Sequence, residues 1–452
     1  MKHPVFACAA FAWFGLSLTG SCWAQEPSRP IGFEPNCLIE IQQTLASALG
    51  EQLVDQVEPV RDNILKTDIY GVSHSRGKVT VEFIPCQQQA MFDLVLVAQS
   101  SSRTVGYHGP VRVYNTAVGD LYGRKRVWID AGGVCFAPAQ ACDRLYPTLE
   151  CMSTRFKNPT LDRAITKAAL KKYYKQDDLA TRIAEDHAAV WIRQGFDRDA
   201  DPQLLSANRD YQEKLRKPYE QRNIFPEQVV LQTTQNTMFI RLRLSEGAGA
   251  VALAAPPEPD AAAEGALRVH ESMLNTGAAR LFAGKTYLSV NVLKELSDLF
   301  SIPIPAEEIK KFEQDDIEIE FDKQRPFEYH FDDNIVQLTI RGTKYVAQDT
   351  EFPAMSIILR FRLERTAKGV RAAAVGDARV TALGKENSNE RLTGPRLRFK
   401  SLLNSHLEDL LKKPQDLDEI ALPPTLGKNV KLVPIQAQTS QGWLVIGIRR
   451  AE

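Results

Sequence analysis

The stretch that decides the fold is Lys78-Val-Thr-Val-Glu-Phe-Ile84, followed after a short polar segment by Ala90-Met-Phe-Asp-Leu-Val-Leu-Val-Ala98. Apolar and polar residues alternate in the first run, which is typical of a strand with one face on a core. The second run is more apolar and predicts a more deeply buried strand. Residues 110–115 and 125–130 alternate as well, with turn residues between them. These runs together predict an antiparallel meander.

Helices are predicted on both sides of this meander. Over residues 36–58 apolar side chains recur at spacings of three or four. Residues 159–223 keep approximate helical spacing, with Gly195 as a stop and Pro202 at the start of a second helix. The segment 153–224 is therefore expected to be a long helical hairpin with a charge-rich, solvated surface.

The last part of the chain repeats the order of helix and meander. Strands are expected at residues 229–233 and 237–244, before an Ala/Pro-rich linker. Further helices are expected at 270–283, 289–300 and 401–412, and further strands at 317–321, 327–331, 335–341, 356–363, 369–375, 379–383 and 443–449. The expected fold class is α+β, with two helix-plus-antiparallel-meander modules flanking a long helical hairpin.

Length and composition bound the organisation of the chain. Its 452 residues suggest two or three domains, and an apolar content of 44% is enough to build a core. The expected divisions are a signal peptide (1–24), an N-terminal helix-plus-meander module (25–152), the helical hairpin (153–224), strands with the linker (225–266) and a C-terminal helix-plus-meander module (267–452).

The overall charge excludes some classes of partner. Basic and acidic residues balance at 56 each. A neutral chain gives no electrostatic case for binding nucleic acid or an anionic membrane surface. No stretch after the N-terminal segment reaches the 18 or so apolar residues of a transmembrane helix, so no membrane span is expected after cleavage.

The N-terminus has the features of a secretory signal peptide. Lys2 and His3 precede an almost wholly apolar run over residues 5–18, and small residues stand before a cleavage site between Ala24 and Gln25. An uncleaved anchor and a lipoprotein modified at Cys22 are the alternative interpretations. Export to the periplasm or the extracellular space is the expectation.

All cysteines after the signal peptide lie in the first third of the chain. An oxidising compartment permits disulfides, but five cysteines leave one unpaired and the sequence does not give the connectivity. The pair Cys135 and Cys142 is favoured by proximity, whereas zinc is disfavoured because no Cys/His cluster has ligand spacing. The disulfide candidates are Cys37, Cys86, Cys135, Cys142 and Cys151.

Three motifs come close to known sites and fall short. Asp197-Arg-Asp-Ala-Asp201 resembles the start of a calcium loop, but Pro202 replaces the required glycine, which favours a helix-hairpin turn capped by Asp201. Gly71-Val-Ser-His-Ser75 lacks the last glycine of a nucleophile elbow. His270-Glu271 lacks the second histidine of a zinc helix, so Glu271 is expected in a first helical turn. The sequence thus predicts no catalytic, metal-binding or cofactor-binding residue and no cofactor.

Several packing and turn motifs are similar to those of a family of uncharacterised exported bacterial proteins of the planctomycete type. They are Arg103-Thr-Val-Gly-Tyr-His-Gly-Pro110, Arg124-Lys-Arg-Val-Trp-Ile-Asp130, Val269-His-Glu-Ser-Met-Leu-Asn275, Leu338-Thr-Ile-Arg-Gly342 and Gly442-Trp-Leu444. This resemblance implies no activity or site residue. The order of helices and long meanders also resembles the tubular lipid-binding superfamily of bactericidal/permeability-increasing protein, which implies a sheet wrapped around a long helix and an apolar tunnel.

The pattern of the sequence and its resemblances are compatible with three functions. The leading hypothesis is an exported, soluble, non-catalytic protein that binds a lipid-like or apolar ligand in a sheet-wrapped groove. The alternative is a structural or protein-interaction component of the cell envelope that presents the helical hairpin to a protein partner. A hydrolase with a site dispersed along the chain is the third possibility.

Overall fold

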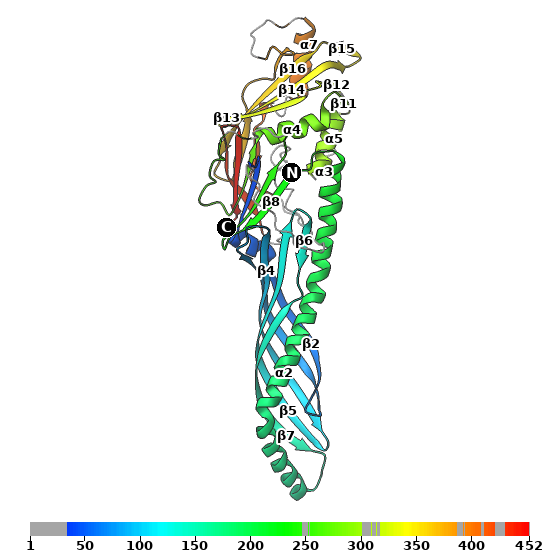
Figure 1. Ribbon diagram of the computed structural model, residues 1–452, viewed down its shortest axis with the longest axis vertical. Helices are drawn as coiled ribbons and strands as arrows, with labels where there is room; N and C mark the ends of the chain where they lie inside the picture. The colour runs from blue at the N-terminus through cyan, green and yellow to red at the C-terminus, as the bar shows by residue number, and fades with distance from the viewer. Residues whose placement is uncertain are drawn as a thin grey trace.

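The computed structural model describes residues 34–245, 252, 254–300, 309, 313, 317–386, 392, 394–407, 411–420 and 430–451. The molecule is an elongated rod made of three sheets (Figure 1). Sheet B, from residues 52–154, lies at one end, and sheet C, from residues 286–417, lies at the other. Sheet A, from strands at 37–42, 228–270 and 432–450, lies between them. Strand pairing is antiparallel in each sheet. The predicted α+β class with antiparallel sheets is therefore confirmed.

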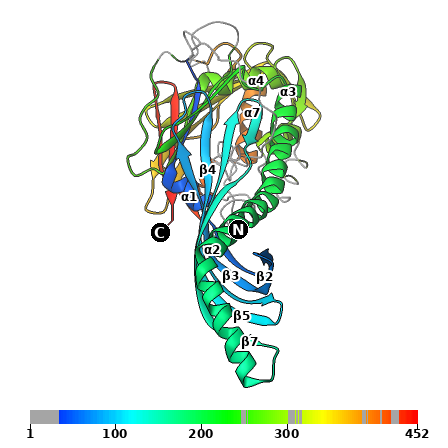
Figure 2. The same ribbon diagram turned by 60° about the horizontal axis from the view of Figure 1, so that its bottom comes forward.

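Sheet B forms the narrow half of the rod and curls around one side of the long helix α2 (Pro159–Asp210), as Figure 2 shows. Its longest strand has 20 residues and spans about 68 Å at the usual rise per residue. The strands are β2 (Gln52–Ile64), β3 (Thr67–Ile84), β4 (Ala90–His108), β5 (Val111–Asp130), β6 (Gly133–Phe136) and β7 (Gln140–Thr154). The runs at 78–84 and 90–98 are the end of β3 and the start of β4, as predicted.

The prediction of separate strands at 110–115 and 125–130 is wrong, because both belong to the continuous strand β5, which pairs with β4 along its whole length. The residues between them looked like turn residues because they include two glycines. A Cβ at Gly119 would lie 2.7 Å from Leu145 Cδ2, and one at Gly123 would lie 3.2 Å from Phe196 Cδ1. These glycines therefore allow close packing within a strand, as happens where another chain segment approaches.

The predicted helical hairpin is also wrong, because residues Pro159–Asp210 form the single helix α2. At 52 residues it is about 78 Å long. A π-helical segment, Tyr211–Arg216, and the short helix α3, Lys217–Gln221, continue it without a turn. Gly195 and Pro202 lie inside α2, which packs along β7 and the concave side of sheet B. This tertiary packing overrides the low helix propensity of the two residues.

Sheet A joins the two halves of the molecule. Its strand order, β20-β21-β10-β1-β9-β8, is symmetrical, since each half gives its first strand and its last hairpin to the sheet. The strands are β1 (Cys37–Gln42), β8 (Gln228–Thr233), β9 (Thr237–Arg243), β10 (Gly265–His270), β20 (Leu432–Ser440) and β21 (Trp443–Arg450).

The helix predicted at 36–58 is wrong, because this segment contains β1, the short helix α1 (Gln43–Gly50) and most of β2. Strand β1 is central in sheet A, between β9 and β10, and is buried on both faces. A short strand buried on both faces carries a run of apolar residues that periodicity alone does not distinguish from a helix.

Sheet C and its helices form the wide end of the rod, where the helices predicted at 270–283 and 289–300 and the predicted strands are confirmed. The strand predicted at 335–341 runs on to Ala347, and the helix predicted at 401–412 begins earlier, at Gly394. The short strands at 286–288, 350–352 and 415–417 are not predicted by the sequence. The strands are β11 (Thr286–Leu288), β12 (Ile317–Phe321), β13 (Phe327–Asp332), β14 (Ile335–Ala347), β15 (Thr350–Phe352), β16 (Met355–Arg365), β17 (Val370–Ala374), β18 (Arg379–Ala382) and β19 (Gln415–Leu417). The helices are α4 (Glu271–Phe282), α5 (Ser289–Phe300) and α7 (Gly394–His406). Within the described residues, no helix combines the length and apolar sequence needed to cross a membrane.

Candidate functional site

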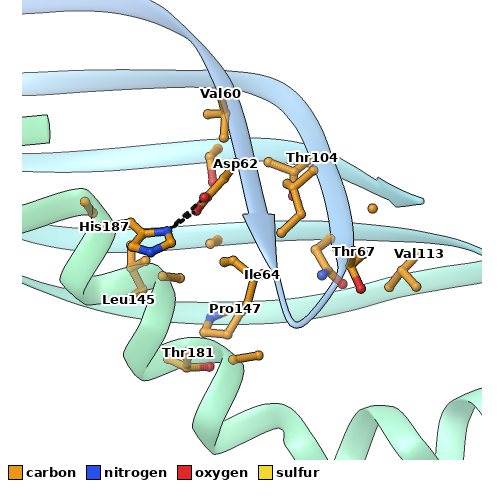
Figure 3. Close-up of a pocket in the computed structure, with 18 of the residues that line it drawn as sticks. Val60, Asp62, Ile64, Thr67, Thr104, Val113, Leu145, Pro147, Thr181 and His187 are labelled. Atoms are coloured by element: carbon orange, nitrogen blue, oxygen red, sulfur yellow. Dashed lines mark hydrogen bonds and ion pairs between the residues drawn. The ribbon is translucent and has the colours of Figure 1, made fainter. Parts of the chain in front are cut away.

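A cavity of about 390 Å³ lies between helix α2 and the concave face of sheet B. Figure 3 shows side chains from β2, β4, β5, β7 and α2 arranged around it. The apolar side chains of the wall come from the strands, from the turn between β2 and β3, and from the helix. They are Val60, Ile64, Leu65, Ile69, Val111, Val113, Leu121, Leu145, Pro147, Met152, Trp191 and Ile192.

Along part of the cavity, α2 presents small side chains to the sheet. Ala180, Ala184 and Ala188 line it at a spacing of four residues, and Ala169 lines it further toward the helix N-terminus. Residues four apart share one face of a helix. A methyl group at each of these positions leaves space that larger side chains would occupy, so the half-barrel stays hollow.

A row of hydroxyl groups crosses the floor of the cavity. Ser73 and Ser75 on β3 lie opposite Ser102 and Ser100 on β4, and Thr104 follows on β4. Alternate residues of a strand share one face, so these short polar side chains point the same way. The floor therefore offers hydrogen-bond donors and acceptors within a mainly apolar wall.

A buried lysine anchors the helix beyond the cavity, on the side of sheet A. Lys125 on β5 is fully buried, and its Nζ lies 2.5 Å from Asp197 Oδ1 and 2.7 Å from Asp201 Oδ1. The ammonium also donates to the Ala137 carbonyl at 3.1 Å and lies 4.7 Å from the centre of the Phe136 ring. A buried charge needs such partners.

These contacts explain the acidic motif at 197–201. Asp197 and Asp201 lie one turn apart on α2 and hold Lys125, so they form neither a calcium loop nor the predicted cap of a hairpin turn. Asp199 pairs instead with Arg198 at 3.2 Å. Among the described residues, no group of three or more His, Cys, Asp and Glu side chains is arranged to hold a metal ion.

On its other long side, α2 meets the edge strand β2 at few points. His187 Nδ1 lies 2.8 Å from Asp62 Oδ1, and Figure 3 shows this hydrogen bond spanning from helix to strand. Trp191, one turn further along α2, lines the cavity and is 62% exposed. The β2 side of the cavity is thus bridged by polar contacts, whereas the β7 side is closed by close packing.

One carboxyl group in the wall has an unusual environment. Burial of Asp143 on β7, together with the nearby charges of Glu185 and Asp120, raises its pKa to about 6, although a backbone hydrogen bond from Arg144 opposes the rise. Its Oδ1 atom makes no hydrogen bond within the described residues. A carboxyl group of this kind is uncharged over part of the acidic pH range.

The predicted disulfides are not present, since the described cysteines form no disulfide bond. Cys135 on β6 lies opposite Trp128, and Cys142 on β7 lies opposite Tyr122. These positions are about 20 Å apart along β5, whereas a disulfide needs Cα atoms within about 7 Å. Cys37 is buried in sheet A, which raises its thiol pKa to about 12, while Cys86 lies opposite Thr233 and Cys151 is exposed on β7.

In the two remaining motifs, the histidine and its neighbours make contacts that explain their positions in the fold. Ser73 lines the cavity, but His74 points to the opposite face of β3 and contacts Asp55, so the two do not form a nucleophile and base. His270 caps helix α4, with its side chain accepting from the Ser272 amide, and Glu271 lies in the first turn as predicted. The signal peptide and its cleavage site at Ala24 and Gln25 lie outside the described residues.

Sequence reasoning missed the residues that make the cavity. The alanines at a spacing of four in α2 and the small hydroxyl residues at alternate positions of β3 and β4 are the signals that could have indicated it. The partners of Lys125 stand 72 and 76 positions away in the chain, and no local pattern links them.

No protein-family model matches this chain, and no curated protein matches it. The resemblance to exported bacterial proteins of the planctomycete type therefore gains no support from these comparisons. Among solved structures, the chain is similar to a crystal structure of lipopolysaccharide binding protein. The TM-score is 0.36 and the sequence identity 9%, over 93% of this chain and 99% of that chain. A similarity with so low a TM-score carries no conclusion about the ligand of this chain.

Proposed function

We propose that the cavity between α2 and sheet B binds the apolar chain of a lipid-like ligand. The observation that carries this proposal is the hollow itself, which is kept open by the alanine face of α2 and walled by aliphatic side chains. Its volume falls within the range of roughly 300–1,000 Å³ that is usual for small-molecule sites. Burial of a hydrocarbon chain against such a wall is favourable in proportion to the apolar area removed from water.

The shape and chemistry of the wall fit an extended, amphipathic molecule. The lining follows the helix from Ala169 to Ile192, so a linear chain can lie parallel to α2. The hydroxyl row formed by Ser73, Ser75, Ser100, Ser102 and Thr104 supplies hydrogen-bond partners for an ester or carboxyl group. A few placed polar groups in an apolar wall are the usual source of ligand orientation.

We propose in addition that the protein is exported and works in the periplasm or outside the cell. The support for this is the sequence of residues 1–24, with its apolar run and small residues before Gln25. N-terminal sequencing of the protein recovered outside the cytoplasm is expected to begin at Gln25. A chain that retains Met1 and stays in the cytoplasm would contradict export.

Displacement of a fluorescent fatty-acid probe tests ligand binding. We expect the purified protein to bind the probe, and Ala184→Phe to weaken binding at least about tenfold, because the ring fills the hollow. The matched control is Ala168→Phe, which adds the same ring to an exposed position of the same helix. Equal binding by the two variants, or no binding by the unmodified protein, would refute the proposal.

A further inference from the structure

The free end of the rod, where α2 begins, carries a dense group of cations. Residues 155–175 contain seven basic residues and one acidic residue. All seven basic side chains are exposed, and none forms an ion pair within the described part of the chain. This basic end consists of Arg155, Lys157, Arg163, Lys167, Lys171, Lys172 and Lys175.

The stability of α2 does not account for these charges. Arg163, Lys167, Lys171 and Lys175 follow one another at a spacing of four, so each side chain has a like charge one turn away, which destabilises a helix. Arg155 and Lys157 lie just before the positive end of the helix dipole, where acidic residues would be favourable. The rest of the helix differs, since residues 177–201 contain seven acidic and three basic residues.

Exposed apolar side chains lie among the cations. Phe156 is 36% exposed just before α2, Leu161 is 45% exposed in its first turn, and Tyr174 is 67% exposed beside Lys175. At the same end of sheet B, the Arg112 guanidinium lies 5.7 Å from the centre of the Tyr107 ring, which is 41% exposed. Figure 1 shows this end projecting as the tip of the molecule, away from sheets A and C.

We propose that the basic end docks the rod onto an anionic lipid bilayer. Cations beside aromatic and aliphatic side chains match the boundary between lipid headgroups and acyl chains, where the charges meet anionic headgroups and the apolar groups insert. A nucleic acid is the competing partner, because exposed aromatic rings can also stack on bases, but it would leave the exposed aliphatic side chain of Leu161 in water. Because the net charge of the whole chain is zero, it does not indicate this local excess of positive charge.

Vesicle co-sedimentation tests the proposal. We expect the purified full chain to bind vesicles that contain phosphatidylglycerol, more weakly as salt is added, and to leave pure phosphatidylcholine vesicles unbound. The variant Lys167→Gln/Lys171→Gln/Lys175→Gln is expected to bind about 100-fold more weakly. The control Arg182→Gln/Arg193→Gln/Arg209→Gln removes the same charge from exposed positions further along α2 and is expected to bind like the unmodified protein.

Three results would overturn the proposal that the basic end docks onto an anionic bilayer. These results are no binding to anionic vesicles, equal loss in the two variants, or binding of a DNA oligonucleotide with vesicles left unbound. Circular dichroism verifies the helix content of both variants. The fatty-acid probe assay, which needs no vesicle, separates this proposal from the proposed ligand binding: the lysine variant is expected to keep probe binding.

Discussion

The two ends of the molecule use similar parts and fill them differently. Sheet C closes over α4, α5 and α7 with a core of aromatic rings, of which Phe282, Phe321 and Tyr345 are almost completely buried. Sheet B closes over α2 with alanines and leaves a cavity. The difference shows that a curled antiparallel sheet and a helix do not by themselves make a binding site. The size of the inward side chains decides between a filled core and a hollow one.

The largest expected loss of stability comes from truncating a leucine in the filled end of the molecule, compared with the same change in the hollow end. Leu338→Ala in sheet C is expected to lower the free energy of unfolding by about 2–5 kcal/mol, because it opens a cavity in a filled core. Leu145→Ala in sheet B removes the same atoms from a wall that already faces a cavity, and we expect a loss of about 1 kcal/mol. Hydrogen exchange in each sheet measures the two losses, and equal losses would mean that sheet B is as filled as sheet C.

The next largest loss of stability is expected from removing Lys125, which holds α2 on sheet B. Lys125→Ala leaves Asp197 and Asp201 without their cation, and we expect a loss of about 2–3 kcal/mol, because these carboxylates are partly solvated. The control Lys78→Ala breaks the exposed pair with Glu51 and is expected to cost less than about 1 kcal/mol. Urea denaturation measures the free energy of unfolding of both variants. An unchanged stability of Lys125→Ala would show that α2 is held by other contacts.

A smaller effect depends on pH through Asp143. Its pKa is raised from an ordinary 3.8 to about 6 in the folded protein, so the folded state holds the proton more tightly than the unfolded state. The stability linked to Asp143 is therefore fully present below pH 3.8 and is lost as the pH rises through about 6. Asp143→Asn is expected to raise stability by about 1 kcal/mol at neutral pH, after allowance for partial exposure, and to have no effect at pH 3. A pH-independent gain would contradict this explanation.

The smallest effect on stability concerns the β2 side of the cavity. Asp62→Asn weakens the hydrogen bond with His187 and is expected to cost less than about 1 kcal/mol, since both side chains are partly exposed. The release of the fatty-acid probe is expected to become faster, because this pair bridges the side where α2 and β2 have few contacts. Stopped-flow measurement of release tests this, with Arg198→Gln, which removes a 3.9 Å contact to Glu58, as the control. An unchanged rate for Asp62→Asn would place the ligand path elsewhere.

Strands with one solvated face could be predicted from the sequence, and elements set by distant partners could not. The alternation of residues 78–84 and 356–363 reports which side chains face a core, and both strands are present. Strand β1 was mistaken for a helix because its pairing with β9 and β10 is absent from its local pattern. Gly195 and Pro202 suggested a break in α2 that the packing of the helix on sheet B prevents.

The site was predictable in kind but not in detail. The resemblance to tubular lipid-binding proteins implied a groove wrapped by a sheet, although the sequence predicted a hairpin where the structure has the single helix α2. The hollow depends on Ala180, Ala184 and Ala188 facing the concave sheet, and a row of alanines favours a helix without showing what it faces. The excess of basic residues at 155–175 is visible in the sequence, but the net charge of the whole chain does not indicate it. Only the fold shows that these residues lie at the tip of the molecule.

A crystal structure of the protein with a brominated fatty acid tests the central claim most directly, because bromine is located by its anomalous scattering. We predict bromine positions between Val60, Val113 and Ala184, inside the cavity of sheet B, and none within the aromatic core of sheet C. A fatty acid that leaves the sheet B cavity empty, or that binds only among the rings of sheet C, would contradict the contrast between a hollow end and a filled one.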